Sequence, residues 1–227
     1  MSRKELIVVG LGASADVTAQ IFRESTDKRI KFFAVDREYI DRSDHQGRPV
    51  LALEDVLERE NPEKVEFFVS IGYGTMNSIR MKKFQQIKAS GFKLASLIHP
   101  QTCLPANFKF GENCFIMNGV NIHPYVSIGD NNFLWSGTTL CHHVTVGSHC
   151  WFTSGSTVAG NTNIGNRCFF GVGSSVTNNL EVGDQCFIGA GALVSKNMKD
   201  EQVVIRKGDE THQLPSGDFL KLIKNDF

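Results

Sequence analysis

Hydrophobic residues in the first hundred positions follow two alternating patterns. The apolar run ELIVVGLG at residues 5–12 ends in glycines, which is typical of a buried parallel strand. Similar runs predict further strands at 30–36, 65–72 and 92–100. Apolar residues at helical spacing predict helices at 14–25, 51–60 and 78–91. Alternating strands and helices argue for a small parallel sheet with helices on its faces.

After Pro100 the apolar period becomes six residues. Sixteen consecutive sixth positions contain only Leu, Ile, Val or Phe, and they are Leu104, Phe110, Ile116, Ile122, Ile128, Leu134, Leu140, Val146, Phe152, Val158, Ile164, Phe170, Val176, Val182, Ile188 and Val194. Four residues after most of them comes a small residue, for example Cys150 or Ser156. A second period of eighteen is marked by Gly111, Gly129, Gly147, Gly165 and Gly183.

Six-residue units nested in an eighteen-residue period describe a prism with three flat sides, in which three strands and three corners make one coil. Each sixth residue fills the interior, and the small residue four positions later packs beside it. This explains four of the six cysteines, Cys114, Cys150, Cys168 and Cys186, as small interior residues. No Cys-x-x-Cys pair occurs, so a zinc or redox motif is disfavoured.

The hexads have the form aliphatic-Gly-x-x-small-x and resemble those of the left-handed β-helix acyltransferases. The order of VVGLGAS, LIHP and then hexads with a histidine resembles the nucleotide-sugar acetyltransferases typified by the sialic acid O-acetyltransferase, bacillosamine N-acetyltransferase and perosamine N-acetyltransferase family. The resemblance extends to about Val194, and the left hand of the helix is implied by it alone. It implies a Rossmann-like nucleotide-sugar-binding domain at 1–100, a β-helix acyltransferase domain at 101–200 and a C-terminal tail at 201–227.

Two adjacent histidines, His142 and His143, interrupt the apolar run at 134–151. His142 is third in its hexad, at a corner, so its side chain points outward. Stacking by eighteen places Gly160, Asn178 and Lys196 in the same column. A metal site needs more converging ligands, and the other histidines of the hexads lie elsewhere in the repeat, so we expect no metal. A solvent-exposed corner histidine without a catalytic role is the alternative.

The resemblance places His142 where that family has its catalytic histidine. A neutral imidazole accepts a proton from a sugar amine or hydroxyl that attacks a thioester. Gly160 would let the acyl group approach the backbone, and its N–H would donate to the thioester carbonyl. With Asn178 and Lys196 it is a candidate for binding acetyl-CoA, the acyl donor. A covalent route through Cys141 is the lesser alternative.

The sequence departs from the family at two positions. The family usually follows its catalytic histidine with Asp or Glu, where this chain has His143, and often has Asn in the preceding hexad, where this chain has Trp135. We therefore expect an orienting carboxylate to come from elsewhere, for example from a neighbouring subunit, or to be absent. His143 is the second catalytic candidate, and Trp135 is a substrate-binding candidate.

The motif GLGAS follows the first predicted strand and opens a helix. A glycine turn at a helix N-terminus offers free N–H groups to a phosphate, and a carboxylate that ends the second strand can bind a ribose. The third glycine of a dinucleotide fingerprint is replaced by Ala15, and a purely structural tight turn is an equal alternative. The resemblance assigns this half to a nucleotide sugar and not to NAD, with the candidates Gly10, Gly12, Ser14, Asp36, Gly72 and Tyr73.

Five aromatic residues recur outward at eighteen-residue spacing, and they are Phe115, Phe133, Trp151, Phe169 and Phe187. Exposed, this aromatic ridge would be too large for a monomer surface. We expect it to be buried against a neighbouring subunit or the chain's own tail. The resemblance implies a homotrimer with active sites between prisms. We also expect a short helix from Ser216 that covers the last coil, whose strand edges otherwise invite association.

Composition limits the partners. The 24 Lys and Arg balance the 24 Asp and Glu, which argues against nucleic acid or an anionic membrane. No run approaches the roughly 18 apolar residues of a membrane helix, and the first residues lack a signal-peptide pattern, so we expect a cytoplasmic protein.

Taken together, the patterns and the resemblance indicate an acetyl-CoA-dependent N-acetyltransferase that acts on a nucleotide-linked amino sugar in surface polysaccharide synthesis (O-antigen or other lipopolysaccharide, capsule or glycan). O-acetylation of a sugar hydroxyl is the alternative enzyme activity. A catalytically silent nucleotide-binding β-helix scaffold is the alternative from another class.

Overall fold

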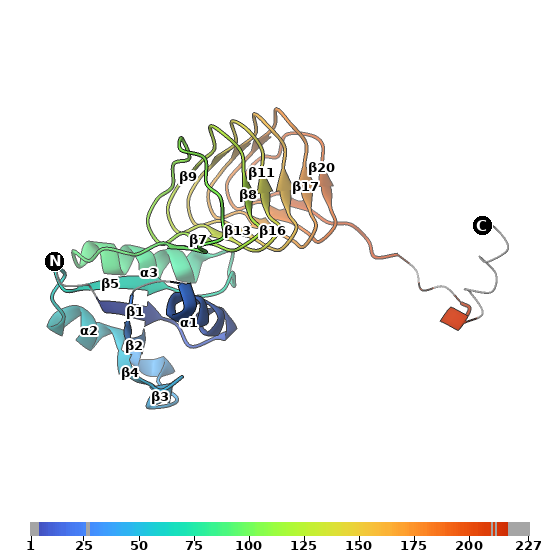
Figure 1. Ribbon diagram of the computed structural model, residues 1–227. Coiled ribbons are helices and arrows are strands. Elements are labelled where there is room, and N and C mark those ends of the chain that lie inside the picture. Colours follow the sequence, from blue (N-terminus) through green and yellow to red (C-terminus); the bar gives the residue numbers. More distant parts are fainter. Residues whose placement is uncertain (1–4, 26–27, 210, 212, 218–227) are drawn as a thin grey trace.

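The computed structural model describes residues 5–25, 28–209, 211 and 213–217. Figure 1 shows an N-terminal α/β part packed against the side of a prism of short, stacked strands. The parts meet along one face of the prism, and this junction positions the candidate site.

The N-terminal part is a five-stranded sheet in the order β3-β4-β2-β1-β5. Four strands are parallel, and β3 pairs antiparallel with β4. The elements are β1 (Glu5–Val9), α1 (Ala13–Ser25), β2 (Ile30–Val35), the short 3-10 helix η1 (Arg37–Tyr39), β3 (Asp44–His45), β4 (Arg48–Ala52), α2 (Leu53–Arg59), β5 (Val65–Val69) and α3 (Ser78–Ala89). The predicted parallel sheet with helices is confirmed.

The two faces of this sheet have different partners. Alternate residues of β1 point to opposite faces. Ile7 and Val9 pack with α2 and α3, whereas Leu6 and Val8 pack with α1 and with aromatic residues of the prism. One face of the sheet is therefore covered by helices of its own part, and the other is covered jointly by α1 and the prism.

Two sequence predictions in this half were wrong in detail. The helix expected at 51–60 begins at Leu53, because Leu51 and Ala52 pair in parallel with β2 as the end of β4. The segment 92–100 does not form a full strand of the N-terminal sheet. Its only strand, β6 (Leu97–Ile98), pairs with the first strand of the prism. The domain limits at residues 100 and 200 therefore stay a prediction.

The prism consists of two-residue strands in three parallel sheets. They are β7 (Phe115–Ile116), β8 (Asn121–Ile122), β9 (Ser127–Ile128), β10 (Phe133–Leu134), β11 (Thr139–Leu140), β12 (Thr145–Val146), β13 (Trp151–Phe152), β14 (Thr157–Val158), β15 (Asn163–Ile164), β16 (Phe169–Phe170), β17 (Ser175–Val176), β18 (Glu181–Val182), β19 (Phe187–Ile188), β20 (Leu193–Val194) and β21 (Val203–Val204). From β7 to β20 every paired residue lies eighteen positions from its partner, for example Leu134 and Phe152. The period read from the sequence is the register of the sheets.

The interior of the prism contains the residues predicted for it. From Ile116 to Val194 every sixth residue is buried, and the four interior cysteines are buried beside them. The first coil departs from the prediction. Phe110 is 41% exposed and stacks on Phe108, because no earlier coil covers it.

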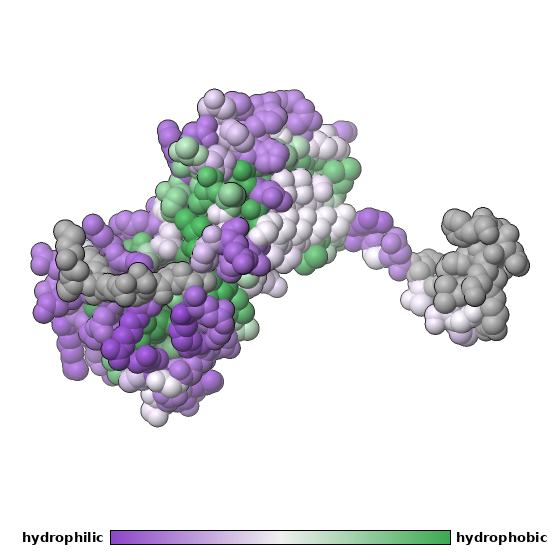
Figure 2. All heavy atoms as spheres, viewed as in Figure 1, coloured by the Kyte–Doolittle hydropathy of each residue, from purple (hydrophilic) through white to green (hydrophobic). Residues whose placement is uncertain are grey.

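The partner expected for the aromatic ridge was wrong. Phe115, Phe133, Trp151 and Phe169 are buried in one cluster with Leu6, Val8, Phe22 and Phe68 of the same chain's N-terminal part. The ridge rings stack on one another, with centroids 4.9 Å apart for Phe133 and Trp151 and 4.8 Å apart for Phe169 and Phe187. Apolar residues accordingly gather where the two parts meet (Figure 2). The ridge therefore holds the two parts of one chain together and needs no second subunit.

One buried cation joins the two parts. Arg80 of α3 is fully buried, and its guanidinium lies 4.6 Å from the ring centroid of Phe133. It donates to the side chains of Asn77 and Asn131 and to the backbone carbonyls of Asn131, His149 and Cys150, at 3.0–3.2 Å. Burial lowers the pKa of Arg80 to about 9, so the group stays charged at neutral pH and all its acceptors are neutral oxygens.

An asparagine continues the junction beside Arg80. Asn113 accepts from the N–H of Val69 at 2.7 Å and donates to the Val69 carbonyl at 3.1 Å. Its amide also donates to Asn131 at 2.8 Å. The Asn113 side chain thus pairs with both the N–H and the carbonyl of the last residue of β5, as a neighbouring strand would. These buried backbone groups therefore have hydrogen-bond partners.

The end of the prism differs from the prediction. The tail beginning at 201 was expected to leave the repeat, but β21 still pairs with β19. The helix expected from Ser216 falls almost entirely on 218–227, outside the described residues. No helix in the described ranges is both long and apolar enough to cross a membrane. Those ranges also contain no group of three or more His, Cys, Asp or Glu side chains placed to hold a metal ion.

His149 makes the junction sensitive to pH. Burial, and then the charge of Arg80, lower its pKa from 6.5 to about 4. Between these values the unfolded chain binds the proton and the folded chain does not, so stability falls as the pH is lowered through this window. Asn also tolerates the left-handed backbone here, φ 66°. We predict that His149→Asn flattens the pH dependence of the free energy of unfolding between pH 6.5 and 4.

Urea unfolding at a series of pH values checks this prediction. His123→Asn, a change at an exposed histidine, is the matched control and should keep the wild-type slope. A wild-type slope in His149→Asn would mean that another group carries the proton uptake.

Candidate active site

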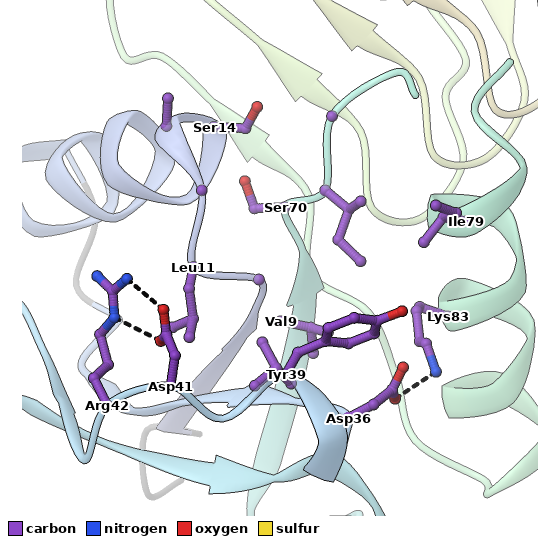
Figure 3. Close-up of a pocket in the computed structure, with 16 residues that line it drawn as sticks. Val9, Leu11, Ser14, Asp36, Tyr39, Asp41, Arg42, Ser70, Ile79 and Lys83 are labelled. Atoms are coloured by element: carbon purple, nitrogen blue, oxygen red, sulfur yellow. Dashed lines mark hydrogen bonds and ion pairs between the residues drawn. The ribbon is translucent and has the colours of Figure 1, made fainter. Parts of the chain in front are cut away.

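A cavity of about 560 Å³ opens at the carboxyl ends of β1, β2 and β5 (Figure 3). Parallel sheets bind ligands at this edge, where loops from neighbouring strands diverge. The cavity is lined by Val9, Gly10, Leu11, Gly12, Ala13, Ser14, Val35, Asp36, Tyr39, Asp41, Arg42, Ser70, Ile71, Gly72, Ile79 and Lys83. It brings together five of the predicted substrate residues: Gly10, Gly12, Ser14, Asp36 and Gly72.

The glycine turn shapes the floor of this cavity. Gly10 has φ +123°, and a Cβ there would lie 2.5 Å from the Ser70 carbonyl oxygen, so the turn requires glycine. Gly12 has no atom within 4 Å of the place a Cβ would take, so packing does not require glycine there. Thr18 of α1 donates to Ser70 at 2.9 Å and holds the helix start beside β5. The N-terminal N–H groups of α1 therefore border an open space.

The opposite wall carries groups that the sequence reading missed. Asp36, at the end of β2, forms an ion pair with Lys83 of α3. Tyr39 is 64% exposed, and Figure 3 shows its ring lying across the cavity toward Lys83. Asp41 and Arg42 pair with each other through two contacts of 2.8 Å. The cavity thus combines a helix start, a carboxylate, an ammonium group and an open aromatic face.

Some of these residues had a signal in the sequence. Ile79 and Lys83 are four apart on a predicted helix, so they share one face, but nothing showed that this face borders the glycine turn. Tyr39, Asp41 and Arg42 follow the second strand without a motif. Their position depends on the β3–β4 hairpin, which the sequence reading did not predict.

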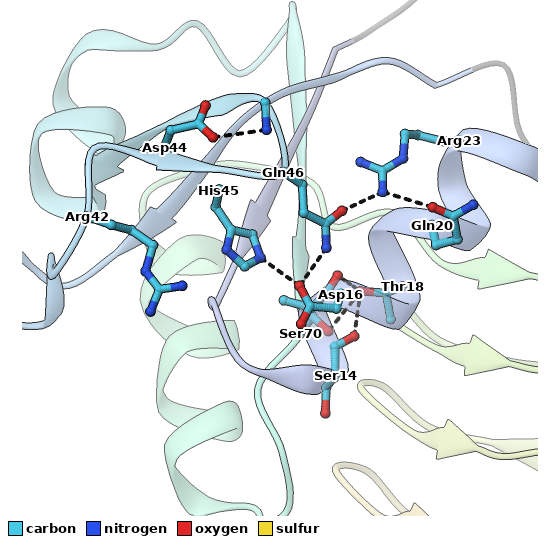
Figure 4. A network of polar contacts seen from close by, with 12 residues as sticks. Ser14, Asp16, Thr18, Gln20, Arg23, Arg42, Asp44, His45, Gln46 and Ser70 are labelled. Atoms are coloured by element: carbon cyan, nitrogen blue, oxygen red, sulfur yellow. Dashed lines mark hydrogen bonds and ion pairs between the residues drawn. The ribbon is translucent and has the colours of Figure 1, made fainter.

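A polar network behind the cavity ties that hairpin to α1 (Figure 4). His45 is buried, and its Nε2 lies 2.9 Å from Asp16. Gln46 also donates to Asp16, at 2.5 Å, and accepts from Arg23. The His45 ring packs edge-on against Phe33, with centroids 4.6 Å apart. These contacts hold the segment that carries Tyr39 and Arg42.

Two predicted substrate residues lie elsewhere. Tyr73 does not line the cavity, since its ring packs on Phe169 with centroids 4.5 Å apart and also contacts Trp151. Trp135 joins the same junction, edge-on to Phe115 at 5.2 Å. Within one chain, both serve the contact between the two parts.

His142 lies at an exposed corner between β11 and β12, as predicted. Its ring covers Gly160 of the next coil, and a Cβ on Gly160 would lie 2.5 Å from Cε1 and 2.8 Å from Nε2 of His142. Only glycine leaves room for the His142 ring at this place, and the predicted role of Gly160 toward the acyl group stays a prediction. Among the described residues, none accepts a hydrogen bond from the Gly160 N–H.

The rest of the column follows the register. Asn178 and Lys196 come two residues after paired positions of β17 and β20, and both are exposed. Together with His142 and Gly160 they form one line along the edge of the prism. This line offers an imidazole, a free N–H, an amide and an ammonium group to a long ligand.

His143 takes the place expected for an orienting group. Its Nδ1 lies 3.2 Å from Nδ1 of His142. Its ring stacks on Tyr125 with centroids 4.7 Å apart and planes 17° apart. The ring beside His142 is thus a second imidazole of the same chain.

The cavity and His142 lie on different sides of the molecule. The N-terminal part packs on the prism face formed by β7, β10, β13, β16 and β19. His142 lies at the corner where the other two faces meet, which is the edge opposite that face. One chain alone does not bring its own cavity to its own His142.

Comparisons with known proteins agree with this architecture. The family model described as bacterial transferase hexapeptide (six repeats) matches residues 109–142. The prism is a hexapeptide-repeat domain. No curated protein sequence matches the chain significantly.

Solved structures share the whole arrangement. The acetyltransferase domain of PglB from Neisseria gonorrhoeae, in complex with acetyl coenzyme A, has a TM-score of 0.78 and 24% identity over 89% of this chain and 96% of its own. PerB from Caulobacter crescentus, in complex with CoA and GDP-perosamine, has a TM-score of 0.65 and 22% identity over 91% of this chain and 99% of its own. WeeI from Acinetobacter baumannii has a TM-score of 0.59 and 16% identity over 89% and 97%. The likeness confirms the predicted fold, an α/β part followed by a left-handed β-helix.

The two glycines of the turn give a matched pair of predictions. Gly10→Ala should destabilise the fold by about 2 kcal/mol, because φ is positive and the methyl group meets a carbonyl. Gly12→Val should stay within about 0.5 kcal/mol of wild type, because its side chain enters open space. The branched side chain should instead weaken nucleotide binding at least tenfold, roughly the loss of one good contact. Thermal unfolding checks the stability of both variants, and calorimetry with nucleotides checks their binding. Equal losses of stability in Gly10→Ala and Gly12→Val would contradict the different roles given to the two glycines.

Gly160 gives a separate prediction. A methyl group in Gly160→Ala displaces the His142 ring, which can swing into solvent, so the melting temperature should stay unchanged. Misplacing a reacting group by about 1 Å can cost on the order of 100-fold in rate, and we expect a loss of that size in kcat. A variant with wild-type kcat would show that the ring's position over Gly160 has no role in the reaction.

Proposed function

We propose that this protein is an acetyl-CoA-dependent N-acetyltransferase that acts on a nucleotide-linked amino sugar, in the cytoplasm, for surface polysaccharide synthesis. The single observation that carries the proposal is the His142 imidazole held over Gly160, which bears a free N–H, at an open edge of the β-helix. A general base beside a hydrogen-bond donor is what acyl transfer from a thioester requires. The PglB domain and PerB, whose architecture this chain shares, are structures with acetyl coenzyme A or with CoA and a nucleotide sugar.

The residues support direct transfer. The sugar amine attacks the thioester carbonyl carbon, and His142 Nε2 takes a proton from the amine nitrogen as the C–N bond forms. The Gly160 N–H donates to the carbonyl oxygen as negative charge develops there. The C–S bond then breaks, and the proton held by His142 passes to the departing thiolate, which gives the amide and CoA thiol. No covalent enzyme intermediate is needed, and Cys141 has no part in this route.

The cavity of the N-terminal part suits the acceptor's nucleotide. The start of α1 provides N–H groups for the diphosphate. Asp36 can accept hydrogen bonds from ribose hydroxyls, and the open face of Tyr39 can stack on a base. Lys83 forms an ion pair with Asp36 and neutralises its charge. Asn178 and Lys196, on the column beyond Gly160, are assigned to acetyl-CoA.

The active site requires a second copy of the chain. His142 lies on the prism edge opposite the N-terminal part, so its acceptor must be held by another copy's cavity. In keeping with the resemblance, we propose a homotrimer with each site between two prisms. Tyr73 and Trp135 are then assigned to the junction that supports the cavity, and substrate contact through them is not needed.

O-acetylation of a hydroxyl would use the same base and donor. A silent scaffold, in contrast, would have no need for a glycine under an exposed imidazole. A panel of UDP-, dTDP- and GDP-linked amino sugars and their hydroxyl counterparts, incubated with acetyl-CoA and analysed by mass spectrometry, distinguishes the three. An acetylated amino sugar supports the proposal, acetylation of the hydroxyl sugars alone supports O-transfer, and binding without any product supports the scaffold.

Two variants complete the test. His142→Asn should lower kcat by about 10²–10⁴-fold with little change in melting temperature, since it removes only the proton acceptor. Gly12→Val should impair the acceptor cavity. If each site takes His142 from one copy and the cavity from another, subunits of the two variants that are unfolded and refolded together should regain activity. Mixtures that stay as inactive as the separate variants would contradict the shared site. The kcat of His142→Asn would still test whether His142 is the base.

A further inference from the structure

The contact between His142 and His143 constrains where their protons lie. Their Nδ1 atoms are 3.2 Å apart, within hydrogen-bond distance. When both rings are neutral, a hydrogen bond between two nitrogens requires a proton on one of them and a lone pair on the other. Only two arrangements are possible, and they differ in which Nε2 is free to accept a proton.

In the first arrangement, His142 carries its proton on Nδ1 and donates it to His143. Its Nε2 then has a free lone pair and can act as the base. In the second arrangement, His143 is the donor, and His142 carries its proton on Nε2. That nitrogen can then take no proton from a substrate, so only the first arrangement is competent for the proposed reaction.

The first arrangement is also stabilised during the reaction. When His142 takes a proton on Nε2 it becomes a cation, while its Nδ1–H still points at the lone pair of His143. A hydrogen bond from a charged donor is about twice as strong as a neutral one. A neutral imidazole can therefore orient its neighbour and stabilise the protonated state, although it lacks the full charge of a carboxylate.

Two features hold the His143 ring in place. Its backbone has φ +59°, which fixes the direction of its side chain at the corner. Its ring lies almost flat on Tyr125, eighteen residues earlier in the same column. Asn161 and Asn179, in the following coils, share this column and its positive φ, so Asn is a residue that this corner accepts.

From this geometry, and resting on the proposed function, we propose that His143 is a positioning residue. It accepts the Nδ1 proton of His142 and thereby keeps His142 Nε2 free as the base, and Tyr125 is the platform that fixes its ring. The proton that crosses to His142 comes from the acceptor amine. His143 changes no bond in the reaction and only selects the tautomer of its neighbour.

Kinetics separate this role from a structural one. His143→Gly removes the acceptor and suits the left-handed backbone, whereas Asn would keep an acceptor in its amide oxygen. Loss of such an orienting partner typically costs about 10–100-fold in activity. We expect kcat to fall by about tenfold while KM for both substrates stays within about twofold. His143→Asp restores an acceptor and should return kcat toward the wild-type value.

The platform has its own pair of variants. Tyr125→Ala removes the stacked ring, and aromatic contacts of this kind contribute about 0.5–1.5 kcal/mol, so kcat should fall between about twofold and tenfold. Tyr125→Phe restores the ring without the hydroxyl and should recover the loss. A loss of equal size in both Tyr125 variants would mean that the hydroxyl, and not the stacking, matters, and would overturn the role of the platform.

A spectroscopic measurement tests the tautomer without any turnover. Two-bond nitrogen–proton NMR spectra of protein labelled with ¹⁵N-histidine, at a pH where the rings are neutral, distinguish Nδ1–H from Nε2–H. We expect His142 to be protonated on Nδ1 in the wild type and in His143→Asp, and to shift toward Nε2–H in His143→Gly, which has no acceptor side chain. His142→Asn identifies the signal.

The outcomes are distinct. An Nε2–H tautomer of His142 in the wild type, or full kcat in His143→Gly, overturns the positioning role. Absence of any acetyl transfer by the wild type overturns the proposed function, and the NMR result then still decides whether His143 sets the tautomer of His142.

Discussion

The arrangement of this molecule depends on one buried guanidinium. Arg80 crosses from α3 into the prism and finds neutral oxygens only, four of which come from Asn131, His149 and Cys150 of two successive coils. A buried cation without these partners would cost several kcal/mol, so the contact specifies where the N-terminal part sits as well as holding it. It places the cavity at one face of the prism and leaves the opposite edge, with His142, open.

Because the period is eighteen residues, residues eighteen positions apart in the sequence lie above one another in columns. Each column stacks residues that lie eighteen positions apart: aromatic rings at the junction, cysteines inside, and His142 over Gly160 at the free edge. Backbone hydrogen bonds link every coil to the next, so the backbone at each corner has little freedom to move. The side chain of a corner residue therefore starts from a fixed position. A base on such a scaffold is held by rigid strands and not by a loop, which suits catalysis that depends on position.

Periodicity made the β-helix, its interior and the corner position of His142 predictable, because each depends on spacing along the chain alone. The glycine turn and Asp36 were predictable for the same reason, since local motifs set them. The partner of the aromatic ridge was not, because an outward face says only that it needs cover. Nor was the wall with Tyr39 and Lys83, which exists only once the β3–β4 hairpin and α3 are packed around the turn.

In the proposed reaction, His143 takes the positioning role for which the resembling family uses a carboxylate. A lone imidazole at this exposed corner would select neither its tautomer nor its ring orientation. Stacking on Tyr125 supplies the orientation, and the Nδ1 contact supplies an acceptor, both from residues of one chain. In the proposed reaction, a second chain adds only the acceptor sugar held in its cavity. Under the proposed function, this opposite placement of cavity and His142 divides the reaction between copies, with the base positioned within one and the substrate held by another.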